Sequence, residues 1–151
     1  MAGPELPRLV ADASVGTKWY LRDEEFLAAA DLVLNDFRDN RINLIAPEQI
    51  RVEVPAAIRN AVRNRRISAS QVEPAIEAFF RLGIATVPCS DELILEGTRL
   101  ALRLNCTVYD GLYLALAEAT ACQIVYADLK LRRNLGSRFP RALWIEDYRS
   151  P

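Results

Sequence analysis

The segment from Thr107 to Leu131, TVYDGLYLALAEATACQIVYADLKL, constrains the fold of this chain more than any other. Apolar residues after Asp110 cover nearly the whole circumference of a helix, which is typical of a helix buried on most sides. The run Ile124–Ala127 then predicts an internal strand, and Asp128 follows it directly. Two aspartates therefore flank structure that is too apolar to need them for folding.

The same pattern of a buried strand followed by an acid opens the chain, where a strand beginning at Arg8 ends in Asp12. Ser14 is a candidate cap for the short segment after it. Further strands are predicted at Ile42–Ala46, Ile84–Val87 and Ala142–Ile145. Helices are predicted from about Asp23 to Asn40, from Pro47 through the Arg66 region, from Ser68 or Ser70 to Leu82, from Ser90 to Asn105, and from Asp110 to about Ala121.

Strands that alternate with helices favour an α/β fold with a central parallel sheet of about five short strands and helices on both faces. We expect a single domain over residues 1–151, with an ordered core at about 8–147. Ligands of such folds bind at the carboxyl ends of the strands. Asp12 and Asp128 are expected at two of these ends, and Asp110 begins a helix that can point towards them.

Composition excludes several kinds of chemistry. The chain has no histidine, which rules out Ser-His-Asp and Cys-His nucleophiles and two-histidine metal sites. Its three cysteines are far apart, which predicts buried free thiols in a reducing compartment. No apolar run is long enough to span a membrane, so we expect a cytoplasmic protein. Any reaction must therefore use carboxylates, hydroxyls, Lys, Arg or Tyr.

Four acids remain as candidate site residues: Asp12, Glu53, Asp110 and Asp128. Glu53 lies at the border of the apolar face of its predicted helix. Considered alone, Asp110 is explained equally well as a helix cap, and Glu53 as an edge charge paired with an Arg. Four converging carboxylates would repel one another unless a cation compensated them. Mg²⁺ or Mn²⁺ suits such oxygen ligands and supports attack on a phosphodiester without histidine.

In four segments the sequence resembles the PIN-domain ribonucleases, and within them the VapC-type toxins of toxin–antitoxin pairs. The segments are VADASVGTKWYL with Asp12 and Ser14, APEQIRVEVPAAIRNAVRNRRIS with Glu53, TVYDGLYLALAEA with Asp110, and VYADLKL with Asp128. The resemblance extends from about Leu9 to Ile145. It implies a three-layer PIN-like fold and Mg²⁺- or Mn²⁺-dependent cleavage of RNA by these four acids. It also implies a homodimer and inhibition by a small VapB-like antitoxin.

Two residues depart from the family pattern. Tyr126 replaces a common Thr or Ser two residues before Asp128, which we expect to reshape the pocket or to weaken the support of that acid. Gly111 replaces a common Ala and is expected to loosen the start of its helix. Ser14 is a candidate supporting residue that hydrogen-bonds an acid or caps a turn. Lys18 and the face with Arg59, Arg63 and Arg66 either contact RNA phosphates or form a solvated surface.

Two other functions compete with the nuclease. In the first, the chain is an inactive PIN-like module that acts only by binding a protein partner. In the second, it is a phosphatase or phosphotransferase with an aspartyl nucleophile at the end of the first strand. Such families usually have a second acid two residues later, where this chain has Ser14, so the phosphatase hypothesis is the weaker one.

Overall fold

A five-stranded sheet runs through the centre of the molecule, which a computed structural model describes for residues 5–151. The strands are β1 (Arg8–Ala11), β2 (Asn43–Pro47), β3 (Ala85–Val87), β4 (Gln123–Tyr126) and β5 (Ala142–Trp144). Their order is β3-β2-β1-β4-β5, and every pairing is parallel. The prediction of an α/β fold with a central parallel sheet is confirmed.

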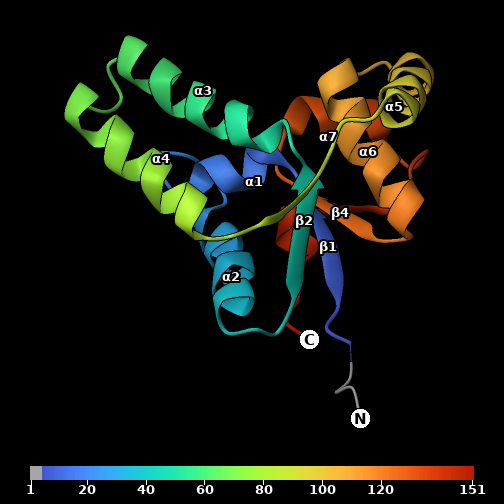
Figure 1. The fold of residues 1–151 in the computed structure, drawn as a ribbon, viewed down its shortest axis with the longest axis horizontal. Coiled ribbons are helices and arrows are strands. Elements are labelled where there is room, and N and C mark those ends of the chain that lie inside the picture. The colour runs from blue at the N-terminus through green and yellow to red at the C-terminus, as the bar shows by residue number, and fades with distance from the viewer. Residues whose placement is uncertain (1–4) are drawn as a thin grey trace.

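Helices cover both faces of this sheet, with α1 to α4 on one side and α5 and α6 on the other (Figure 1). Their bounds are α1 (Ala13–Lys18), α2 (Leu27–Arg38), α3 (Ile50–Arg63), α4 (Val72–Arg81), α5 (Asp91–Leu104), α6 (Val108–Thr120) and α7 (Leu129–Leu135), with 3₁₀ turns at Ala69–Gln71 and Ile145–Asp147. Helix α6 packs directly on β1, β2 and β4, and α5 packs outside it. The residues Gly111–Ala117 are all buried, as the apolar circumference predicts.

The topology brings the ends of two distant strands together. The chain runs outward from β1 to β2 and β3, and then returns to place β4 on the other side of β1. Ala11 pairs with Val125, and the amide of Asp12 donates to the carbonyl of Val125 at 3.0 Å. In an open parallel sheet, the point where strand order reverses is where a ligand crevice forms. Asp12 and the segment leading to Asp128 lie at this point.

Gly111 has a packing role that its sequence context does not indicate. A Cβ atom added at Gly111 would lie 2.0 Å from the backbone oxygen of Gly97 on α5, which no side chain tolerates. The two glycines therefore allow α5 and α6 to approach backbone to backbone. This contact, rather than a loosened helix start, explains the departure from Ala.

Two predicted helix starts are wrong. Helix α2 begins at Leu27 rather than at Asp23, because Asp23 is engaged by Arg66 at 2.7 Å instead of capping a helix. Helix α3 begins at Ile50 rather than at Pro47, since Pro47 still pairs in the sheet with Val87. In both cases a tertiary contact overrides the local signal.

No helix within residues 5–151 is long and apolar enough to cross a membrane. The cysteines Cys89, Cys106 and Cys122 are free, as expected, but they are only partly buried.

Candidate acidic active site

Asp12 is held by Ser14 at the carboxyl end of β1. It is the N-cap of α1, and one of its oxygens, Oδ2, accepts hydrogen bonds from both the amide and the hydroxyl of Ser14. The Ser14 hydroxyl also accepts a bond from the amide of Ala127 at 2.9 Å. Ser14 therefore ties Asp12 to the end of β4, so it supports an acid rather than capping a helix.

Asp110 and Asp128 line one pocket of about 490 Å³, together with Asn105, Cys106, Thr107, Lys130, Leu131 and Asn134. Asp110 is the third residue of α6, and its Oδ2 accepts from the amide of the N-cap Thr107 at 3.2 Å. Asp128 is the N-cap of α7 and accepts from the amide of Leu131 through Oδ1 at 2.8 Å. Both acids thus have a capping role as well as a place in the pocket.

Glu53 approaches from the first turn of α3. Its Oε1 accepts a hydrogen bond from the hydroxyl of Tyr113 on α6 at 3.1 Å. It has no ion-pair partner among residues 5–151, so the structure does not support the alternative of an edge charge paired with an Arg.

Electrostatic repulsion links the four acids. Burial, followed by the charges of Asp110 and Glu53, raises the pKa of Asp12 to about 7 against the bonds from Ser14. Burial and the charge of Asp110 also raise the pKa of Glu53. The pKa of Asp110 is raised by burial and by Asp128. The carboxylates of Asp12, Glu53 and Asp110 are therefore destabilised by burial and by their neighbours, which is the condition that a bound cation relieves.

The four acids supply the oxygen ligands that a hard divalent ion prefers. They are not, however, close enough together in this structure to coordinate one ion. In each of the three aspartates, one carboxylate oxygen accepts a hydrogen bond from the protein. The other oxygen accepts none from any donor within residues 5–151. Such free carboxylate oxygens are the ligands that Mg²⁺ and Mn²⁺ prefer. However, no three acidic, Cys or His side chains of the described residues lie together closely enough to hold one ion. The expectation that all four already meet around one point is therefore not met.

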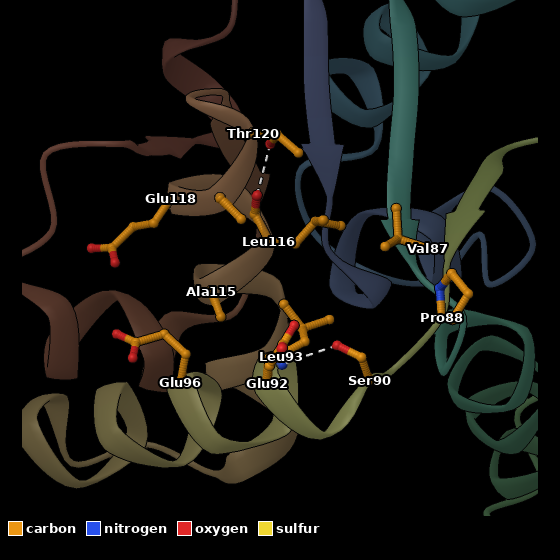
Figure 2. A pocket seen from close by; sticks show the side chains of 11 residues that line it. Val87, Pro88, Ser90, Glu92, Leu93, Glu96, Ala115, Leu116, Glu118 and Thr120 are labelled. Carbon is orange, nitrogen blue, oxygen red and sulfur yellow. Dashed lines mark hydrogen bonds between the residues drawn. The ribbon is translucent and has the colours of Figure 1, made fainter.

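A second hollow, of about 580 Å³, lies between α5, α6 and the end of β3 (Figure 2). Its wall is largely apolar, and Figure 2 shows the side chains of Glu92, Glu96 and Glu118 around it. None of the four candidate acids lines this hollow. It is therefore separate from the acidic pocket.

Two of the cations considered for contact with RNA have other contacts. Lys18 is buried and pairs with Glu24 at 3.2 Å, and Arg66 binds Asp23 and Glu24. Lys130, which the sequence analysis did not single out, instead lines the acidic pocket and lowers the pKa of Asp110 in opposition to burial. Its position two residues after Asp128 is the sequence feature that could have indicated its place in the pocket.

Tyr126 does not line the acidic pocket. Its ring packs edge-on against Trp144, with centroids 5.4 Å apart, and Asp128 keeps its bond to Leu131. The expected disturbance of the site by this residue is therefore absent from the structure. Tyr113, in contrast, contacts Glu53 and was missed, because it matched the apolar pattern of its helix.

Comparisons with known proteins agree with this fold. The sequence model of the PIN domain matches residues 9–134. A VapC ribonuclease of Mycobacterium bovis and ribonuclease VapC9 of Mycobacterium tuberculosis are each 33% identical over 112 residues, covering 69% of this chain and 83% of the relative. Ribonuclease VapC1 of Mycobacterium tuberculosis is 40% identical over 86 residues, covering 57% of this chain and 63% of the relative.

The crystal structure of PAE2754 from Pyrobaculum aerophilum superposes with a TM-score of 0.62 at 18% identity, covering 94% of this chain and 92% of the other. At this identity the likeness concerns the fold alone. The chain belongs to the PIN-domain family, and within that family it is of the VapC type.

Proposed function

We propose that this protein is a Mg²⁺- or Mn²⁺-dependent endoribonuclease and the toxin of a type II toxin–antitoxin pair. One observation carries the proposal: burial and mutual repulsion raise the pKa of Asp12, Glu53 and Asp110, and Asp128 adds to the repulsion on Asp110, in a chain whose relatives are VapC ribonucleases. Perturbed acids gathered in a cleft are typical of functional sites.

In this proposal the free oxygens of Asp12, Asp110 and Asp128, with Glu53, hold the divalent ion. A divalent ion bound there would offset the negative charge that builds on a phosphodiester during hydrolysis. Ser14 keeps Asp12 fixed against the end of β4. Lys130 provides a cation at the pocket wall for the phosphate backbone of RNA.

Substitution of Asp110 by Asn tests the proposal most simply. Asn keeps the size of the side chain and an oxygen for Thr107, but it removes the charge that a cation requires. We expect Asp110→Asn to lower Mg²⁺-dependent RNA cleavage at least ~100-fold and to abolish growth inhibition. Asp39→Asn is the matched control, since Asp39 is exposed and outside the pocket. Full activity of Asp110→Asn would contradict the proposal.

A second function, an inactive PIN-like module that acts through a protein partner, is favoured by the absence of a closed group of three ligands within residues 5–151. It predicts no metal-dependent cleavage by the wild-type protein and no effect of Asp110→Asn. Sequencing RNA ends after brief expression separates the two functions and identifies the RNA that is cut.

We also propose two protein partners: a second copy of this chain and a short antitoxin. Three exposed apolar side chains support a protein interface near the acids, because Val52, Tyr109 and Leu129 each adjoin one of the acids in the sequence. Exposed apolar groups of this kind mark protein contacts when they cluster. Light scattering of the purified protein is expected to give the mass of a dimer, and Tyr109→Ser with Leu129→Ser is expected to give a monomer.

A further inference from the structure

Tyr113 carries the only polar side chain in the buried stretch Gly111–Ala117 of α6. Its side chain is 1% exposed, and its hydroxyl must therefore find a partner inside the protein. That partner is Glu53, which is 60 residues away in the sequence and lies on α3. Tyr113 also follows Asp110 by three residues, so both side chains project from the same side of α6.

A second contact joins the same two helix starts. The side-chain amide of Gln49 donates to the backbone oxygen of Tyr109 at 2.9 Å. Gln49 and Glu53 are four residues apart, and so are Tyr109 and Tyr113, so the two contacts are spaced by one helical turn on both helices. The start of α3 is thereby fixed to the start of α6, which carries Asp110.

The Tyr113 hydroxyl is a permanent donor. Burial and the acids Asp12 and Glu53 raise its pKa, so the phenol keeps its proton. Glu53 faces the repulsion of Asp110 and has no cation partner among residues 5–151, and a free glutamate side chain would turn towards solvent. The bond from Tyr113 opposes that movement.

We propose that Tyr113 is a positioning residue that holds the Glu53 carboxylate on the side of Asp12 and Asp110, and so sets the affinity of the site for its divalent cation. This inference rests on the proposed function. Helix α6 then contributes to the site in two ways: it carries Asp110, and through the Tyr113 hydroxyl it orients Glu53. Groups that orient metal ligands typically contribute 10- to 100-fold to metal affinity.

The test measures Mn²⁺ binding by calorimetry in four proteins: wild type, Tyr113→Phe, Glu53→Gln and the double variant. Tyr113→Phe removes one oxygen and leaves the ring in the core. We expect it to weaken Mn²⁺ binding ~10-fold or more, with RNA cleavage recovering at saturating Mn²⁺. In the Glu53→Gln background the same change is expected to have no further effect, because the carboxylate it positions is gone.

Tyr20→Phe is the matched control, since Tyr20 packs against Phe79 and contacts none of the acids. Wild-type Mn²⁺ affinity in Tyr113→Phe would overturn the inference and leave the proposed function intact. An equal loss in both backgrounds would also overturn it, because Tyr113 would then act through the fold rather than through Glu53. Absence of saturable Mn²⁺ binding in the wild type would overturn the proposed function and the inference together.

Discussion

Two buried aspartates of this protein lie in opposite electrostatic environments. Asp36 on α2 is 1% exposed, and Asp12 at the end of β1 is 5% exposed. Burial alone would raise the pKa of Asp36, but bonds from Ser150 and Tyr148 and the charge of Arg41 hold that pKa below its usual range. Asp12 has Ser14 as its donor and two acids as neighbours, and its pKa rises to about 7.

The difference separates a structural acid from a functional one. Asp36 accepts bonds at 2.8 Å from Tyr148 and at 2.6 Å from Ser150, and it thereby fixes the end of the chain to α2. Its burial is compensated by donors that the fold itself supplies. The burial of Asp12 is compensated only by Ser14, and above about pH 7 the folded protein therefore retains a charge that a bound cation would stabilise.

The largest expected effect is a gain of stability when Asp12 is neutralised. Because the folded-state pKa of Asp12 is raised, the folded protein binds the proton more tightly, and metal-free stability falls as the pH rises from about 4 to about 7. A shift of about three pKa units bounds this loss at ~4 kcal/mol. Asp12→Asn is expected to remove this loss of stability. At pH 7.5 the variant should therefore unfold at a higher urea concentration than the wild type.

The control for this experiment is the same pair of proteins at pH 4, where their stabilities are expected to converge. Saturating Mn²⁺ is expected to stabilise the wild type at pH 7.5 and to leave Asp12→Asn little changed. If Asp12→Asn were less stable than the wild type at pH 7.5, the charge of Asp12 would stabilise the fold as that of Asp36 does, and the distinction between the two acids would be wrong.

Asp36→Asn is expected to act in the opposite direction. It removes the charge that strengthens the bonds from Tyr148, Ser150 and Arg41, so we expect a loss of ~1–2 kcal/mol in the free energy of unfolding. Urea unfolding at neutral pH measures it, and RNA cleavage by the folded variant is expected to stay at the wild-type level. A loss of cleavage without a loss of stability would place Asp36 in the site and remove the distinction.

The smallest expected effect concerns Lys130, a cation that lines the acidic pocket. Lys130→Gln is expected to lower RNA cleavage ~3- to 10-fold, mainly by weakening the contact with phosphate, and the difference should shrink at high salt. Arg133→Gln on the same helix is the control, because Arg133 does not line the pocket. Equal losses in both variants would indicate a general effect of charge on RNA binding.

The sequence predicts the central elements because their signals are local and strong. Apolar strands that end in Asp12 and Asp128, and a helix that is apolar on all sides, define a parallel sheet with acids at one edge. In the structure β1 and β4 are neighbouring strands, with Ala11 paired to Val125, so the two strand ends that precede Asp12 and Asp128 lie side by side.

The remaining features depend on contacts between distant residues, which no local pattern encodes. The start of α2 depends on Arg66, which binds Asp23 from 43 residues away. The bond between Tyr113 and Glu53 and the approach of Gly97 to Gly111 depend on how α6 packs against its neighbours. The hydrogen bond that Asp36 accepts from Tyr148 joins residues that are 112 positions apart in the sequence.

A crystal of the wild-type protein grown with Mn²⁺ tests the central claim most directly, through the anomalous difference map. The account predicts a Mn²⁺ peak within coordination distance of the carboxylates of Asp12, Asp110 and Asp128, with Glu53 turned towards it. A fully occupied peak elsewhere, with these side chains unchanged, would contradict it.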